Sequence, residues 1–97
     1  MSRDVHSRLC RAILHKAAPA RLVQSRAQPW ASVTFTGARH WLALHVAPQS
    51  AARVRRDLPE ARFDLPGHLV ADLEICGEQT QADGVVLHVE ALTVMSC

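Results

Sequence analysis

The stretch that decides the fold reads ASVTFTGARHWLALHV and covers residues 31–46. On either side of Gly37–Ala38, apolar and polar side chains alternate with the two-residue period of a half-buried β-strand. A two-residue turn at that point would pair Phe35 with His40 and bring the apolar side chains of both strands to one face. We therefore predict a first hairpin over residues 30–46.

The last third of the chain returns to the same period and predicts a second hairpin, over residues 68–94. If Ile75 pairs with Val85, the apolar side chains again share one face of the sheet. The polar loop between these two strands is then centred near Thr80 and should be exposed.

Two other stretches have helical spacing. Apolar residues three and four positions apart predict an amphipathic helix over residues 3–17, so that residues 1–28 make up a basic helix and a polar connector. The connector has no period that assigns it a structure. A second helix is predicted within residues 48–63, because Pro48 suits a first helical turn and Pro59 lies near the end of the pattern.

The predicted order of elements is αββαββ, and a length of 97 residues supports one hydrophobic core. We predict one α+β domain, residues 1–97, in which two helices cover one face of a four-stranded, mainly antiparallel sheet. A composition of 48% hydrophobic and 21% charged residues is typical of a globular protein. No apolar run approaches the roughly 18 residues that span a bilayer, so no membrane contact is expected.

The cysteines and the N-terminus indicate the cellular location of the protein, and the arginine content indicates its source. Three cysteines, at positions 10, 76 and 97, form no CxxC pair, and the N-terminus lacks the apolar core of a secretory signal. Both features favour a reducing, cytoplasmic location. Ten arginines against one lysine, with no asparagine or tyrosine, indicate a GC-rich coding sequence and a bacterial source. That bias weakens arginine abundance as evidence for phosphate binding.

Charge divides the chain unevenly, with a net +8 over residues 1–63 and −6 over residues 64–97. This asymmetry is compatible with a nucleic-acid face, with self-complementary assembly, or with basic helices laid beside an acidic sheet. Clustered cations meet the electrostatic requirement of phosphate binding, but few aromatic residues are present for bases to stack on. The candidate nucleic-acid contacts are Arg3, Arg8, Arg11, Lys16 and Arg21.

The sheet face turned away from the helices is the candidate interface. It is too apolar for a water-exposed face and too charged for a core. Its apolar members are Trp41, Val70, Val86, Leu92 and Val94. We expect a second copy of the chain to cover this face and form a homodimer; the alternative is cover by the connector or by the C-terminal tail.

The same face carries a polar cluster of Asp72, Glu74, His88 and Glu90. A histidine beside carboxylates suits general acid–base chemistry or a metal ion. Cross-strand polar pairs are also common on sheet surfaces, and we favour that interpretation. In the predicted register Cys76 lies roughly 13 Å along the strand from His88, which argues against a thiol catalytic site.

His6 and Cys10 stand four residues apart on the predicted first helix, but no third ligand is near in sequence, so we predict neither a metal nor a cofactor. The chain contains no phosphate loop and no GxGxxG, GxSxG or HExxH motif. We therefore expect a small, self-associating interaction module without catalytic activity. Nucleic-acid binding is the alternative, and a small-molecule enzyme or ligand binder on the sheet face is the third hypothesis.

Overall fold

The computed structural model describes residues 4–96. Helix α1 (Val5–Lys16) begins where the Asp4 carboxylate accepts a hydrogen bond of 2.7 Å from the backbone N–H of Ser7. Such a cap satisfies one of the free donors in the first turn of a helix. The buried residues of α1 form one stripe: Leu9, Cys10 and Ile13.

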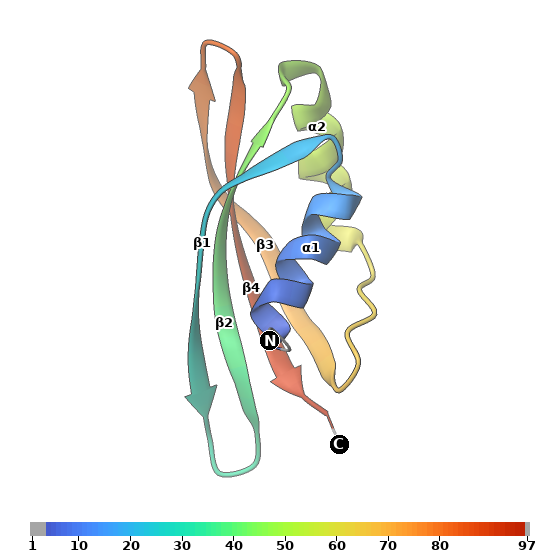
Figure 1. Ribbon diagram of the computed structural model, residues 1–97, viewed down its shortest axis with the longest axis vertical. Helices are drawn as coiled ribbons and strands as arrows, with labels where there is room; N and C mark the ends of the chain where they lie inside the picture. Colours follow the sequence, from blue (N-terminus) through green and yellow to red (C-terminus); the bar gives the residue numbers. More distant parts are fainter. Residues whose placement is uncertain (1–3, 97) are drawn as a thin grey trace.

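Four strands and one further helix follow α1. The strands are β1 (Ala20–Ala31), β2 (Thr36–Val46), β3 (His68–Gln81) and β4 (Gly84–Met95). Between β2 and β3 lie α2 (Pro48–Asp57) and a short 3-10 helix, η1 (Leu58–Glu60). The strand order is β1-β2-β4-β3, and every neighbouring pair is antiparallel (Figure 1). The predicted α+β class and the order αββαββ are confirmed.

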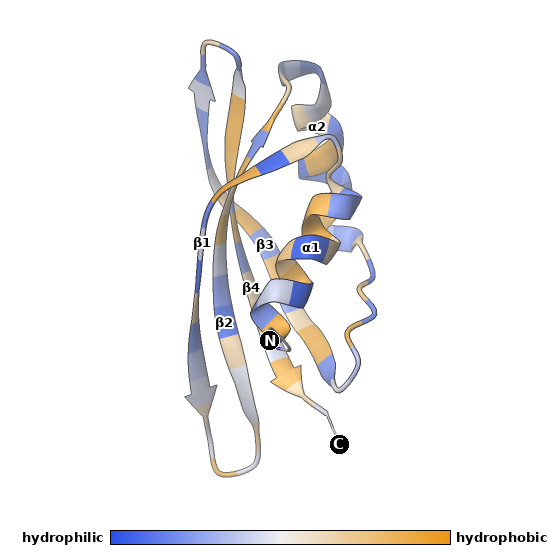
Figure 2. Cartoon of the chain, in the orientation of Figure 1, coloured by the Kyte–Doolittle hydropathy of each residue, from blue (hydrophilic) through white to orange (hydrophobic). Residues whose placement is uncertain are grey.

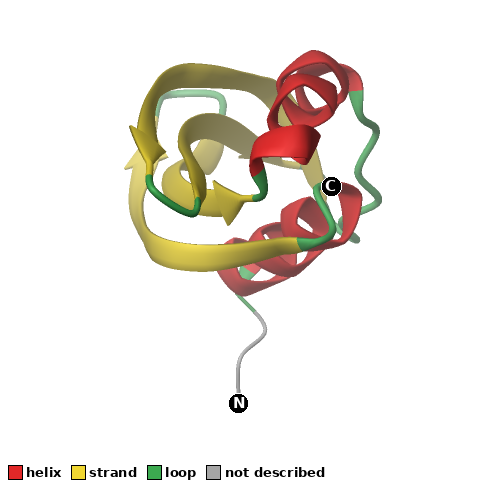
Figure 3. Cartoon of the chain, turned by 90° about the horizontal axis from the view of Figure 1, so that it is seen from above, coloured by secondary structure: helices red, strands yellow, loops and turns green. Residues whose placement is uncertain are grey.

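Both helices lie on one side of the twisted sheet, which curls around the core when the protein is viewed from above (Figure 3). Helix α1 lies against β1 and β2, and α2 lies against β4. The core between the helices and the sheet includes the fully buried side chains of Leu9, Ile13, Leu44, Leu87 and Val89. Within residues 4–96, no helix is long and apolar enough to cross a membrane.

The first hairpin differs from the prediction. β1 starts at Ala20, so most of the connector is a strand, and the turn lies at residues 32–35 instead of Gly37–Ala38. Phe35 is therefore a turn residue, and His40 pairs with Ala27. The predicted turn was wrong because β1 is an edge strand without regular alternation.

The irregularity of β1 has a structural cause. The register against β2 shifts between Leu22 and Gln24, so that Val23 is an extra, unpaired residue in β1. Most side chains of β1 are exposed, and its sequence does not need to alternate between apolar and polar. A period of two is visible only where one face of a strand is buried throughout.

The second hairpin also has a different register. A two-residue turn at Ala82–Asp83 joins β3 to β4, and Ile75 pairs with Val89 instead of with the residue we predicted. Two irregularities, at Ala71 and Cys76, each add one residue to β3. Each extra residue reverses the inward and outward alternation beyond it, and the sequence pattern gives no sign of where this happens.

Candidate functional site

The β1–β2 hairpin projects past the start of α1, so no helix covers its far half (Figure 1). A cleft of about 760 Å³ lies at this end of the molecule. Ala27, Pro29 and Ala38 line it from the hairpin, and Val5 and His6 line it from α1. Its volume is within the range of clefts that bind ligands or partner side chains.

Exposed apolar side chains surround the same end. Val33 and Phe35, in the turn between β1 and β2, are 102% and 56% exposed, and Leu69 and Met95, from the paired ends of β3 and β4, are also exposed. In Figure 2 the ends of β3 and β4 beside this region are coloured as hydrophobic. We call the cleft together with Val33, Phe35 and Met95 the open end. The other large exposed apolar residues in the described chain are Val23 on β1 and Leu69, which pairs with Val94 on the outward sheet face.

Ser32 holds the turn at the open end in shape. Its backbone N–H donates to the carbonyl oxygen of Phe35 at 2.7 Å, and the Phe35 N–H donates to the Ser32 hydroxyl oxygen at 3.1 Å. Two bonds across four residues fix the backbone of this loop. The exposure of Val33 and Phe35 is therefore built into an ordered turn.

A chain of hydrogen bonds runs through the wall of the cleft behind His6. His6 Nδ1 lies 2.9 Å from His40 Nδ1, and His40 Nε2 lies 2.9 Å from the Thr93 hydroxyl oxygen. On the other side of His6, Nε2 is 3.1 Å from the Ser25 hydroxyl and 3.6 Å from the Cys10 sulfur. The chain thus links α1, β1, β2 and β4.

The direction of these bonds follows from their last member. The Thr93 hydroxyl lies 3.3 Å from the carbonyl oxygen of Ala38, which can only accept, so the hydroxyl donates to it. His40 Nε2–H then donates to Thr93, and the free Nδ1 of a neutral His40 accepts from His6 Nδ1–H. In the tautomer with its hydrogen on Nδ1, His6 accepts from the Ser25 hydroxyl through Nε2. The side chains of His6, His40 and Thr93 in this hydrogen-bonded series therefore all have partners, as buried polar groups require.

Burial sets the protonation of these groups. His40 is 0% exposed, and its removal from water lowers its pKa to about 4, with the His6 ring beside it acting in the same direction. Burial also raises the pKa of the Cys10 thiol, an effect that the neighbouring Ser25 hydroxyl partly offsets. Since the thiolate is the nucleophilic form, Cys10 is held in its unreactive form. This chain of hydrogen bonds fastens α1 to the sheet, and none of its members is an activated nucleophile.

Sequence reasoning missed both the cleft and this chain. The cleft depends on where the β1–β2 hairpin turns, which the pattern did not reveal. The sequence does contain a sign of the hydrogen-bond chain, because His40 and Thr93 both fall on the otherwise apolar, helix-facing positions of their strands. Polar residues at such positions in two strands indicate a buried hydrogen bond. His6 and Cys10 were noted for their spacing, and they do lie side by side, but their partners are His40 and Ser25.

The predicted interface residues divide between the two faces. Trp41, Val86, Leu92 and Val94 occupy outward positions on β2 and β4, whereas Val70 packs against the core. Val70 was assigned to the wrong face because the extra residue at Ala71 reverses the alternation of β3. The outward patch is also well covered: the Arg26 guanidinium carbon lies 3.8 Å from the centre of the Trp41 ring, and Val86 is 5% exposed.

The predicted polar cluster does share the outward face, but its ion pair was not foreseen. Glu74 pairs directly with Glu90, and the Arg39 guanidinium lies 2.6 Å from the Glu90 carboxylate. Asp72 pairs with Leu92 and lines a groove together with Arg39, Glu74 and Glu90. Within residues 4–96, no three histidine, cysteine, aspartate or glutamate side chains are grouped as a metal would need. The arrangement is that of a cross-strand polar ladder.

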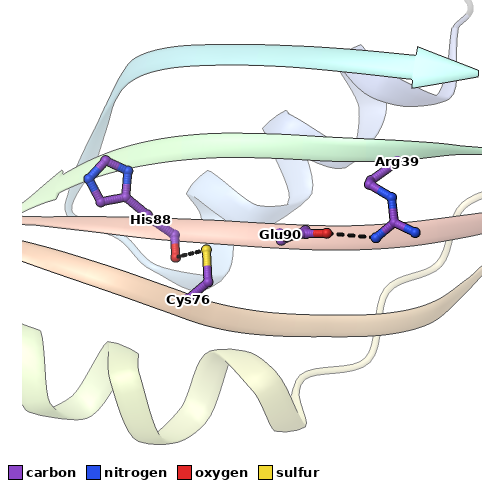
Figure 4. Close-up of polar contacts among 4 residues, drawn as sticks. All are labelled: Arg39, Cys76, His88 and Glu90. Atoms are coloured by element: carbon purple, nitrogen blue, oxygen red, sulfur yellow. Dashed lines mark hydrogen bonds and ion pairs between the residues drawn. The ribbon is translucent and has the colours of Figure 1, made fainter.

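Cys76 lies much nearer to His88 than the predicted register allowed. The extra residue in β3 places Cys76 and Gly77 opposite His88, so the distance of roughly 13 Å was wrong. The Cys76 sulfur lies 3.5 Å from the backbone carbonyl oxygen of His88, and Figure 4 shows the imidazole ring turned away from it. The thiol therefore contacts the backbone, and the His88 ring is not placed to act as its general base.

The predicted nucleic-acid contacts are only partly together. Arg8, Arg11 and Lys16 line one groove beside α1. Arg21 is on β1, where it pairs with His45, and Arg3 lies outside the described residues.

Comparison with known proteins gives no relative: no family model, no curated protein and no solved structure matches this chain.

Proposed function

We propose that this protein is a small assembly module that forms a two-fold dimer through its open end. The observation that carries the proposal is the gathering of three exposed apolar side chains around an apolar cleft, when the rest of the described surface exposes two other large apolar residues, well apart from each other. Contiguous exposed apolar surface of this kind is typical of protein interfaces. The free thiols of Cys10 and Cys76 suit a reducing location such as the cytoplasm.

A second copy of the chain is the occupant that fits this surface. The open end carries both a projecting apolar turn, at Val33 and Phe35, and an apolar hollow beside it. A two-fold axis lets the same patch serve both partners, because each turn can enter the hollow of the other copy. Such an interface commonly buries about 800 Å² per partner, roughly an eighth of the 6116 Å² that one copy exposes.

The open end supports self-association better than the outward sheet face does. Arg26 already covers Trp41, Val86 is almost fully buried, and Arg39 and Glu90 form an ion pair in the middle of that face. A partner docking there would have to displace or bury these charges, which costs free energy. The turn at Val33 and Phe35 has no such cover.

Sedimentation velocity across the micromolar concentration range tests the proposal. The wild-type chain should sediment as a dimer, and Phe35→Glu should sediment as a monomer with an unchanged circular dichroism spectrum, because a charge would enter an apolar interface. Val23→Glu is the matched control, since Val23 is also exposed and apolar but lies outside the open end. It should leave the dimer intact.

Two results would contradict the proposal. If the wild-type chain is monomeric throughout the micromolar range, the proposed dimer does not form. A dimer that Phe35→Glu leaves unchanged uses some other part of the molecule. Val33→Asp provides a second measurement at the same turn and should act like Phe35→Glu.

A further inference from the structure

A second groove, of about 510 Å³, runs between α1 and the segment of residues 61–65. In Figure 1 this segment, which leads from η1 toward β3, passes beside α1. The groove shares no lining residue with the cleft at the open end, so it is independent of the proposed dimer. Its charged lining residues are Arg8, Arg11, Lys16, Arg62 and Asp64, and His15 also lines it.

The cations of this groove are not neutralised within the protein. The described chain contains four side-chain ion pairs, and none of them involves Arg8, Arg11, Lys16 or Arg62. Arg8 makes a long contact of 3.5 Å to the carbonyl oxygen of Pro66. Four cations against one carboxylate give the groove a positive potential, which concentrates anions at its surface.

The groove also has apolar lining residues. They are Ala12 of α1 and Phe63 and Leu65 of the neighbouring segment, and the Phe63 side chain is partly exposed. A groove that combines an aromatic ring with several guanidinium groups suits a ligand with alternating anionic and flat apolar parts.

We propose that this groove binds single-stranded nucleic acid, with the phosphates on the cations of α1 and Arg62 and a base stacked on Phe63. Arg8, Arg11 and Lys16 line the groove along about 12 Å of the helix axis, at 1.5 Å per residue. A linear track of this kind follows a backbone and does not converge on one phosphate. Guanidinium groups also bind phosphate oxygens in a bidentate manner.

Fluorescence anisotropy with a labelled single-stranded oligonucleotide of about 12 mixed-sequence bases measures this binding. Arg8→Gln with Arg11→Gln should lower the affinity and flatten the salt dependence, because each lost phosphate contact removes about 0.7 from the slope of log affinity against log salt. The matched control is Arg26→Gln with Arg39→Gln, which removes the same charge from the opposite sheet face and should leave the slope unchanged.

Phe63→Leu separates stacking from charge, because it keeps an apolar side chain and the same net charge. It should weaken single-strand binding by roughly five-fold or more while leaving the salt slope unchanged. The proposal is overturned if the wild-type chain does not bind at about 50 mM salt, or if the two double variants lose affinity equally. It is also overturned if duplex DNA or an acidic peptide of equal charge binds as tightly as the single strand and Phe63→Leu has no effect.

Discussion

His6 and His40 meet through their Nδ1 atoms at 2.9 Å, and their rings are parallel to within 2°. His6 belongs to α1 and His40 to β2, so this bond joins the first turns of the helix to a central strand. Two nitrogens can share one hydrogen only if one of them is unprotonated. Because the burial of His40 keeps its ring neutral, the bond depends on pH.

The first prediction concerns the free energy of unfolding at acid pH. His40 has a pKa of about 4 in the folded protein against 6.5 when unfolded, so the unfolded chain binds more protons between these values. The contribution that neutral His40 makes to the free energy of unfolding is therefore fully present above pH 6.5 and is lost as the pH falls toward 4. We expect a slope of about 1.4 kcal/mol per pH unit in urea unfolding curves measured across this window.

His40→Leu provides the control for this effect. It removes the titrating ring, so the slope between pH 6.5 and 4 should be much smaller even though the variant is less stable. The carboxylates of Asp57 and Asp83 do not interfere, because hydrogen bonds from Arg56 and His45 lower their pKa below the usual 3.8 and their contribution is lost at lower pH. An equal slope in His40→Leu would show that other groups carry the effect.

The second prediction compares two glycines within the sheet. A Cβ atom on Gly37 would overlap the carbonyl oxygen of Thr93 and press on the Trp30 ring, whereas one on Gly77 would reach only the His88 ring at 3.9 Å. Gly37→Ala should therefore lower the free energy of unfolding by roughly 2 kcal/mol. Gly77→Ala should stay within about 0.5 kcal/mol of the wild type in the same urea titration.

Equal effects of the two alanine substitutions would contradict this packing of β2 against β4.

Gly37 also explains why the sequence pattern suggested a turn there: glycine is common in turns, but here it allows the close approach of a neighbouring strand. The one described residue with a left-handed backbone conformation is Gly67, with φ of 81°, in the turn that leads into β3.

The period of the sequence predicted the helices and the two central strands because these elements have one buried and one exposed side along their whole length. Leu42, Leu44 and Leu87 face the helices as expected. The edge strands were harder: β1 is mostly exposed, and β3 contains two extra residues that the sequence does not mark. Val70 and Cys76 were misplaced for that reason.

The candidate sites were harder to predict than the fold, because they depend on register and on where elements end. The open end exists because β1 and β2 extend past α1, which is a difference in length that no single motif records. Arg62 and Phe63 join the cations of α1 only through the path of the segment before β3. Residues brought together in this way have no fixed spacing in the sequence.

The third prediction tests how α1 is attached to the sheet. Leu9 is fully buried at the centre of the core, so Leu9→Asp would bury an unpaired carboxylate there and should unfold the chain. Leu9→Ala should fold with a loss of roughly 3 kcal/mol, which falls within the total stability expected of a small domain. Circular dichroism and urea unfolding measure both. A folded Leu9→Asp variant would place Leu9 outside the core.

The last prediction decides between the two surfaces that could form a dimer. Leu92 lies on the outward sheet face directly opposite Arg39, so Leu92→Glu places the new carboxylate beside a cation and should leave the fold intact. If the dimer forms through the open end, Leu92→Glu should sediment as the wild type does, whereas Phe35→Glu should be monomeric under the same conditions. The opposite pair of results would move the interface to the outward face. Unfolding of Leu92→Glu, measured by circular dichroism, would mean that Leu92 belongs to the core and that the two faces of β4 have been exchanged.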